Sequence, residues 1–175
     1  MTKLFWIDME MTGLDVSKEV IIEVAAVITD LQLNALDTYS TVVRQEQKYL
    51  DAMDDWNKTH HRESGLTEAV PKGKDPAVVE RELIALLDKH FKDERAVIAG
   101  NSISQDRLFI NKYFKSFAAR LHYRMLDVTA WKIMMNARFG IIHQKKNAHR
   151  AVDDIQESID EMRLYLSKVD PAKAN

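Results

Sequence analysis

The feature that most constrains the fold is an apolar run rich in β-branched residues at 20–29 (VIIEVAAVIT), with charged residues on both sides. Such a run predicts a β-strand. Residues 4–10 predict a neighbouring strand, and the sequence TGLD at 12–15 predicts a turn between the two. Residues 38–44 alternate weakly and predict a third strand. We therefore expect the chain to begin with an antiparallel β-meander.

The rest of the chain alternates between predicted helices and strands. Asp75 and Pro76 are typical of an N-cap followed by proline at the first helical position. The expected elements are a helix at 76–91, a strand at 96–100, a helix at 109–117, a strand at 123–128, and helices at 130–138 and 152–166. This order indicates an α/β fold in which helices pack on a mixed five-stranded sheet.

Composition limits the class of protein. With 175 residues, of which 46% are hydrophobic, we expect one domain at 1–167 and a polar tail at 168–175. A formal net charge of −2 gives no global positive field, so any polyanionic partner must be bound locally. Since there is no cysteine, oxygen and imidazole ligands remain, and oxygen-rich sites favour Mg²⁺ or Mn²⁺. Without a signal peptide or a membrane-length apolar stretch, we expect a soluble, cytoplasmic protein.

Two acids in the first predicted strand, Asp8 and Glu10, are two residues apart. Because side chains alternate along a strand, both carboxylates lie on one face, whereas Ile7 and Met9 lie on the other. Two like charges about 4 Å apart repel by roughly 4 kcal/mol at an effective dielectric of about 20, so the pair must share a proton or surround a cation. A solvent-facing edge strand would carry such a pair equally well.

Further acids occur near the starts of two later helices. Asp106 follows the strand at 96–100, where short polar residues suit a phosphate, although a carboxylate there could simply complement the helix dipole. His149 and Asp154 would diverge by about 140° on one helix, so they converge only if His149 precedes it. Asp153 is the rival by spacing. We favour Asp154 because it flanks the apolar stripe, and we expect Asp153 to be an exposed first-turn acid.

Several blocks occur in a specific order over residues 4–166. They are IDMEMTGL at 7–14, MDDWN at 53–57, SGL at 64–66, GNSI at 100–103, QDR at 105–107, HYR at 122–124, LDV at 126–128, DDI at 153–155 and ES at 157–158. With the His-x4-Asp spacing of His149 and Asp154, these blocks closely resemble the oligoribonuclease family of DEDD exonucleases, histidine subtype.

The resemblance implies an RNase H-like exonuclease fold and hydrolysis that uses two divalent ions, Mg²⁺ or Mn²⁺. The implied metal ligands, which we expect to form an exposed acid ring, are Asp8, Glu10, Asp106 and Asp154. His149 would be the general base. The implied reaction is 3′-to-5′ cleavage of very short RNA, especially dinucleotides, to nucleoside 5′-monophosphates.

The resemblance also implies a site for two bases. Leu14 would wedge between the bases, and Trp56 would stack on one of them. His61 would lie near the phosphate. The alternative for Trp56 is a residue that packs a helix.

A cap for the 5′ phosphate is implied as well. Ser102, Arg124 and Thr129 would hold this phosphate, and Tyr123 would reach over from the partner subunit of a homodimer, so that longer chains are excluded. Thr129 stands where the family commonly has serine. The alternative for Arg124 is a surface salt bridge.

Two other functions remain open. A proofreading-type DNA exonuclease with the same five catalytic residues would have an open groove and would tolerate long strands. A catalytically silent nucleotide-binding module would keep the fold alone.

Overall fold

The computed structural model describes residues 2–143 and 150–169. A five-stranded sheet with the strand order β3-β2-β1-β4-β5 forms its centre. The strands are β1 (Lys3–Met11), β2 (Ile21–Asp30), β3 (Ala35–Val42), β4 (Ala96–Gly100) and β5 (Leu121–Asp127). The first three are antiparallel, whereas β4 runs parallel to β1 and β5 runs parallel to β4. The predicted α/β class and mixed sheet are confirmed.

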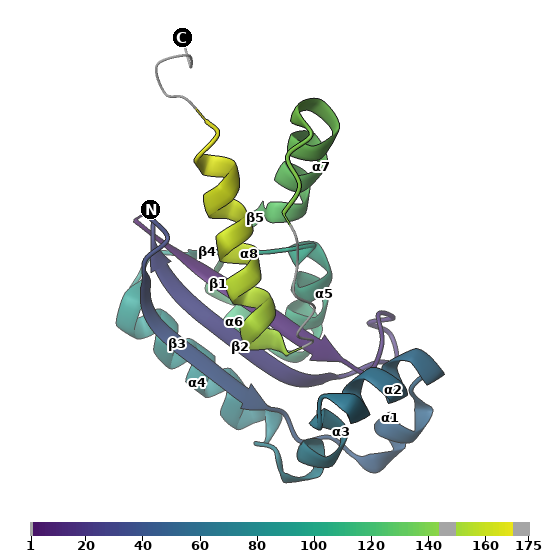
Figure 1. The fold of residues 1–175 in the computed structure, drawn as a ribbon. Coiled ribbons are helices and arrows are strands. Elements are labelled where there is room, and N and C mark those ends of the chain that lie inside the picture. Colours follow the sequence, from purple (N-terminus) through teal and green to yellow (C-terminus); the bar gives the residue numbers. More distant parts are fainter. Residues whose placement is uncertain (1, 144–149, 170–175) are drawn as a thin grey trace.

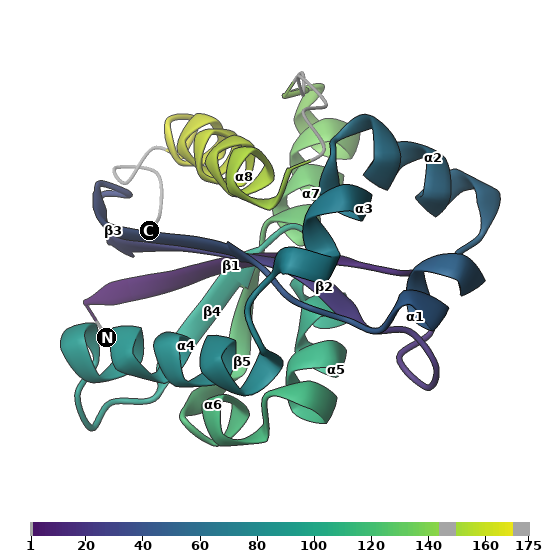
Figure 2. The same ribbon diagram turned by 90° about the horizontal axis from the view of Figure 1, so that it is seen from below.

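Helices cover both faces of this sheet. They are α1 (Gln47–Ala52), α2 (Asp55–Glu63), α3 (Leu66–Ala69), the 3₁₀ helix η1 (Val70–Lys72), α4 (Pro76–His90), α5 (Ile103–Tyr113), α6 (Lys115–Ala119), α7 (Val128–Phe139) and α8 (Ala151–Leu166). Figure 2 shows α8 on one side of the sheet and α4, α5 and α6 on the other. Helices α1 to α3 lie beyond the end of β1 (Figure 1).

The alternation of side chains along β1 separates the two cores. Phe5, Ile7 and Met9 pack in the core that includes α4 and α5, whereas Leu4 and Trp6 pack in the core that includes α8. Strand β2 is buried on both faces, which explains why its run is apolar almost throughout. Even-numbered side chains of β1 therefore face α8, and this fixes the side of the sheet on which Asp8 and Glu10 lie.

Most predicted elements are present, with bounds that shift by a few residues. Asp75 caps α4 by accepting a hydrogen bond from the Ala77 amide, as its sequence predicts. The predicted helix at 109–117 is two helices, because the backbone leaves helical geometry at Phe114 (φ −122°, ψ 62°). In the described part of the chain, every helix is too short or too polar to cross a membrane.

Candidate active site

Three carboxylates converge where β1 meets the start of α8. Asp8 and Glu10 lie on the α8 side of β1, and α8 packs against β1 and β2 with Asp154 in its first turn. One oxygen from each of Asp8, Glu10 and Asp154 lies within 4.8 Å of the other two. All three side chains are partly buried. Acids from two distant parts of the chain thus meet at one point.

Asp106 is the fourth predicted ligand, and it is more buried than we expected. It lies in the first turn of α5 on the face that carries Ile103 and Phe109, and it is only 6% exposed. The expectation of an exposed acid ring is therefore wrong, because Asp106 is buried and the other three acids are partly buried. Asp106 is also outside the group that lies within 4.8 Å. Burial raises the pKa of Asp106 to about 7, and the charge of Asp127 acts in the same direction. We call Asp8, Glu10, Asp106 and Asp154 the acid cluster.

Within the acid cluster, the ionised form of Glu10 is disfavoured. Burial is the largest cause that raises the pKa of this carboxyl, to about 8, and repulsion from Asp154, Glu23 and Asp106 adds to it. Arg150 acts in the opposite direction. Because burial and repulsion both disfavour the charged form, the ionised cluster requires a compensating positive charge.

The histidine of the predicted site cannot be placed. His149 lies outside the described residues, so its role stays a prediction. Helix α8 begins at Ala151, with Arg150 as its N-cap residue. Asp153 is exposed, in agreement with the expectation, whereas Asp154 is partly buried among the other acids.

Sequence reasoning missed Glu23 and Arg150. Glu23 lies opposite Glu10 in the register of β1 and β2 and is 1% exposed. Arg150 donates to Glu23 Oε1 from Nη2 at 2.6 Å and from Nε at 3.1 Å. The signal was an acid in the middle of an otherwise apolar strand, which needs a partner when it is buried.

The residues expected near the bases lie around the end of β1. Leu14 is 74% exposed, and Gln105 Nε2 donates to its carbonyl oxygen at 2.6 Å. Trp56 on α2 is 60% exposed and stacks on His60, with ring centroids 3.8 Å apart. Trp56 is thus not a core residue.

His61 connects helix α2 to this end of the sheet. Its ring is buried, and Nε2 lies 2.9 Å from the carbonyl oxygen of Met11, the last residue of β1. Burial lowers the pKa of His61. A neutral ring hydrogen-bonded to Met11 holds α2, the helix that carries Trp56, at the end of β1.

Two of the expected phosphate ligands are brought together. The hydroxyl oxygens of Ser102 and Thr129 are 3.2 Å apart. Ser102 has a left-handed backbone (φ 50°), and its amide donates to Asp127 Oδ1 at 3.1 Å and to Thr129 Oγ1 at 2.9 Å. Left-handed geometry is uncommon outside glycine, so these two acceptors stabilise a strained turn. Both residues line a hollow of about 640 Å³, together with Lys132.

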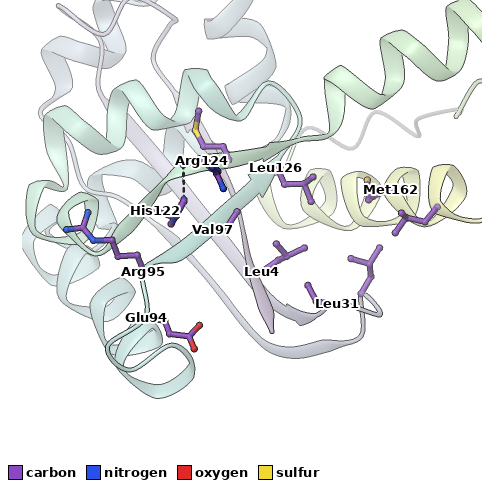
Figure 3. Close-up of a pocket in the computed structure, with 12 residues that line it drawn as sticks. Leu4, Leu31, Glu94, Arg95, Val97, His122, Arg124, Leu126 and Met162 are labelled. Carbon is purple, nitrogen blue, oxygen red and sulfur yellow. Dashed lines mark hydrogen bonds between the residues drawn. The ribbon is translucent and has the colours of Figure 1, made fainter. Parts of the chain in front are cut away.

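Arg124 and Tyr123 lie on β5, at the edge of the sheet. Tyr123 is 73% exposed, and the guanidinium carbon of Arg124 lies 5.1 Å from the centre of its ring. Arg124 lines a different hollow, of about 710 Å³, whose walls include Leu4 and Met162 (Figure 3). The structure therefore brings Ser102 and Thr129 together in one hollow, whereas Arg124 lines the other.

Comparison with known proteins gives close relatives over almost the whole chain. The family model described as "Exonuclease" matches residues 5–162. An oligoribonuclease of Ectopseudomonas mendocina (strain ymp) is 42% identical over 167 residues, which cover 93% of each chain. The mitochondrial oligoribonuclease of Homo sapiens is 37% identical over 176 residues, which cover 95% of this chain and 73% of that protein.

Solved structures support the fold. The zinc-bound complex of E. coli exonuclease I with single-stranded DNA superposes with a TM-score of 0.77 at 16% identity, covering 96% of this chain and 41% of that one. Exonuclease I from Methylocaldum szegediense gives a TM-score of 0.73 at 17% identity, covering 99% and 42%. This chain thus spans about two fifths of the length of these enzymes, and the likeness confirms the predicted RNase H-like exonuclease fold.

Proposed function

Because this chain belongs to the oligoribonuclease family of exonucleases, we propose that it is a 3′-to-5′ exoribonuclease whose substrates are very short RNAs, dinucleotides above all. The products are nucleoside 5′-monophosphates. The observation that carries the proposal is the convergence of Asp8, Glu10 and Asp154 within 4.8 Å. Carboxylates at this spacing are suited to the cations that phosphodiester hydrolysis uses.

The donor set fits divalent cations. The raised pKa values of Glu10 and Asp106 reflect a charge that burial and neighbouring acids leave uncompensated. We propose that the acid cluster holds two Mg²⁺ or Mn²⁺ ions, because four carboxylates balance four positive charges and oxygen ligands favour these metals. When bound, such ions polarise the scissile phosphate and lower the pKa of a water molecule.

His149 is proposed as the general base that takes the proton of the attacking water. A histidine with an ordinary pKa near 6.5 is largely neutral at pH 7 and can accept a proton. Its place in the sequence supports this role, since it lies two residues before α8, whose first turn carries Asp154.

Exposed apolar side chains support a site for two bases. We assign Leu14 as a wedge between the bases and Trp56 as a stacking platform, a contact that contributes about 1–3 kcal/mol per base without reading sequence. His61, beside the last residue of β1, is assigned a place near the substrate phosphate.

Ser102 and Thr129 are proposed to bind the 5′ phosphate, and their paired hydroxyls support this assignment. Arg124 and the partner subunit's Tyr123 complete the proposed cap in a homodimer, which agrees with the exposure of Tyr123 on an edge strand. Sedimentation that finds an active monomer would overturn the part that Tyr123 plays.

A length titration tests the proposed function. RNAs labelled at the 5′ end, from two to twenty nucleotides long, are incubated with Mg²⁺ or Mn²⁺, with a chelator as control. We expect release of mononucleotides, fastest from dinucleotides and absent with the chelator. Rates that rise with length would identify a long-strand exonuclease instead, and no release at any length would identify a silent binding module.

Arg124 is tested by a variant of its own, because it lines a different hollow from Ser102 and Thr129. Arg124→Ala is expected to weaken binding of dinucleotides and to relax discrimination against longer RNA. Arg95→Ala is the matched control, since it removes a second cation from the hollow that Arg124 lines. The control should keep the length preference of the wild type. If Arg124→Ala keeps it too, Arg124 is not part of the cap.

A further inference from the structure

An ion pair between the buried Glu23 and the partly exposed Arg150 joins β2 to the N-cap residue of α8. Glu23 is enclosed in the sheet, and its carboxylate accepts hydrogen bonds from Arg150 Nη2 at 2.6 Å and from Arg150 Nε at 3.1 Å. The amide of Ala151 donates to its second oxygen at 3.3 Å. Three donors from the start of one helix thus converge on one carboxylate of a strand.

Each partner of this pair is directly connected to a member of the acid cluster. Glu23 is the cross-strand neighbour of Glu10. The carbonyl oxygen of Arg150 accepts the amides of Asp153 at 2.9 Å and of Asp154 at 3.0 Å. A displacement of Arg150 would therefore move Asp154 relative to Glu10.

Glu23 is close to the acid cluster, yet it is not part of the ligand group. Among the described residues, the carboxylates that meet within 4.8 Å are those of Asp8, Glu10 and Asp154. The oxygens of Glu23 are instead engaged by Arg150 and Ala151. A contact between a guanidinium and a buried carboxylate has a defined direction, which suits it to fixing the position of a helix.

We propose that the Glu23–Arg150 pair positions the metal site: it fixes the start of α8 against β2, so that Asp154 faces Asp8 and Glu10. Glu23 and Arg150 are positioning residues and do not themselves hold the ion. The inference rests on the proposed function, which assigns the acid cluster as ligands. Groups that orient ligands typically change metal affinity or activity by about 10–100-fold when they are removed.

Arg150→Ala is the decisive variant, because charge and position predict opposite results. Removal of a positive charge near a cation site would by itself tighten cation binding. Loss of the position of α8 would weaken it. We expect the dissociation constant for Mn²⁺, measured from the electron paramagnetic resonance signal of unbound Mn²⁺, to rise by about 10–100-fold. The kcat should fall, while KM for a dinucleotide at saturating Mn²⁺ stays within about twofold of the wild-type value.

Conservative variants and a control complete the experiment. Arg150→Lys keeps the charge but cannot make the contact through two nitrogens, so its loss of Mn²⁺ affinity should lie between wild type and Arg150→Ala. Glu23→Gln keeps an acceptor and should likewise be less impaired than Glu23→Ala. Arg120→Ala breaks an arginine–carboxylate pair away from the acid cluster, Arg120 with the exposed Asp88 at 2.8 Å, and should leave Mn²⁺ affinity unchanged.

Thermal unfolding without metal distinguishes positioning from a purely structural role. If Arg150→Ala unfolds at a lower temperature but binds Mn²⁺ as tightly as wild type or more tightly, the pair only stabilises the fold and the inference is overturned. If the alanine variants fail to fold, Arg150→Lys and Glu23→Gln decide on the same measurement. A wild-type protein that binds Mn²⁺ but cleaves no dinucleotide would refute the proposed function. The Mn²⁺ affinities of the variants and the wild type would still test the positioning role of the pair.

Discussion

Two regions of this molecule bury carboxylates, and they differ in what surrounds them. In the acid cluster, burial and repulsion raise the pKa of Glu10 to about 8. In the second region, Glu161 of α8 is fully buried but well supplied with donors. Tyr165 Oη donates to it at 2.6 Å and Asn101 Nδ2 at 3.1 Å, and Lys132 Nζ lies 3.8 Å away.

The difference separates an acid whose hydrogen bonds the fold supplies from the acids that we propose as metal ligands. Asp154 and Glu161 lie seven residues apart on α8, so one helix serves both regions. The carboxylate of Glu161 has partners within the protein, and these contacts join α8 to Asn101, which follows β4, and to Lys132 of α7. The acid cluster has more negative charge than its surroundings compensate, which is the property of a site that binds a cation.

A glutamate-to-glutamine substitution should lower turnover strongly in the acid cluster and hardly at all at Glu161. Glu10→Gln removes a proposed metal ligand without a change of shape, and turnover of a dinucleotide should fall about 10³-fold, since metal coordination contributes several kcal/mol to the transition state. Glu161→Gln should keep turnover within about threefold of wild type. Steady-state kinetics in Mg²⁺ checks both. If Glu10→Gln keeps a tenth of wild-type activity, the contrast between the regions is broken.

The free energy of unfolding should fall more when Glu161 is replaced than when Glu10 is replaced. Glu161→Ala leaves Asn101 and Tyr165 without their buried acceptor and Lys132 without its partner. We expect a loss of about 3 kcal/mol in the free energy of unfolding, measured with denaturant. Glu10→Ala, measured without metal, should lose less or even gain stability because a repulsive charge is removed. Equal losses would mean that the acid cluster is structural too.

The pH dependence of stability sharpens the comparison further. The pKa of Glu10 is about 8 in the folded chain against an ordinary 4.5, so between these values the unfolded chain releases a proton that the folded chain keeps. The melting temperature of the metal-free protein should therefore fall as the pH rises through this window. Mn²⁺ should restore it most at the alkaline end.

Glu10→Gln is the control for this titration, because it has no carboxyl to ionise at this position. Its metal-free melting temperature should fall less over the same range of pH. Identical pH profiles for the variant and the wild type would show that Glu10 does not carry the shift.

The smallest effect is expected at Thr129, whose hydroxyl is hydrogen-bonded to Asn101, one of the donors to Glu161. Thr129 Oγ1 lies 3.2 Å from Asn101 Oδ1 and accepts the amide of Ser102. Thr129→Val removes the hydroxyl but keeps the shape, and KM for a 5′-phosphorylated dinucleotide should rise about fivefold, the equivalent of one hydrogen bond. Thr129→Ser should match wild type. If KM for the substrate without a 5′ phosphate rises equally, Thr129 does not contact that phosphate.

The sheet was predictable because its signals are local. The apolar run of β2 and the alternation in β1 both follow from which faces are buried, and the stripe of α8 follows in the same way. Helices α1 to α3 were not predicted. The sequence of α2, DWNKTHHRE, has one large apolar residue, Trp56, so it contains no apolar stripe that periodicity could detect.

The candidate site was predictable in its acids but not in their surroundings. The two-residue spacing of Asp8 and Glu10 determines a shared face on any strand. The burial of Asp106 depends on how deeply α5 packs, and the partner of Glu23 lies 127 residues away in Arg150. Such long-range contacts leave no periodic signal in either segment.

Anomalous diffraction from crystals soaked in Mn²⁺ tests the central claim most directly. We predict two manganese peaks within bonding distance of the carboxylates of Glu10 and Asp154, with Asp8 and Asp106 completing the ligands. Manganese that is ordered elsewhere in the crystal, with none at the end of β1, would contradict the claim that these acids form a metal site.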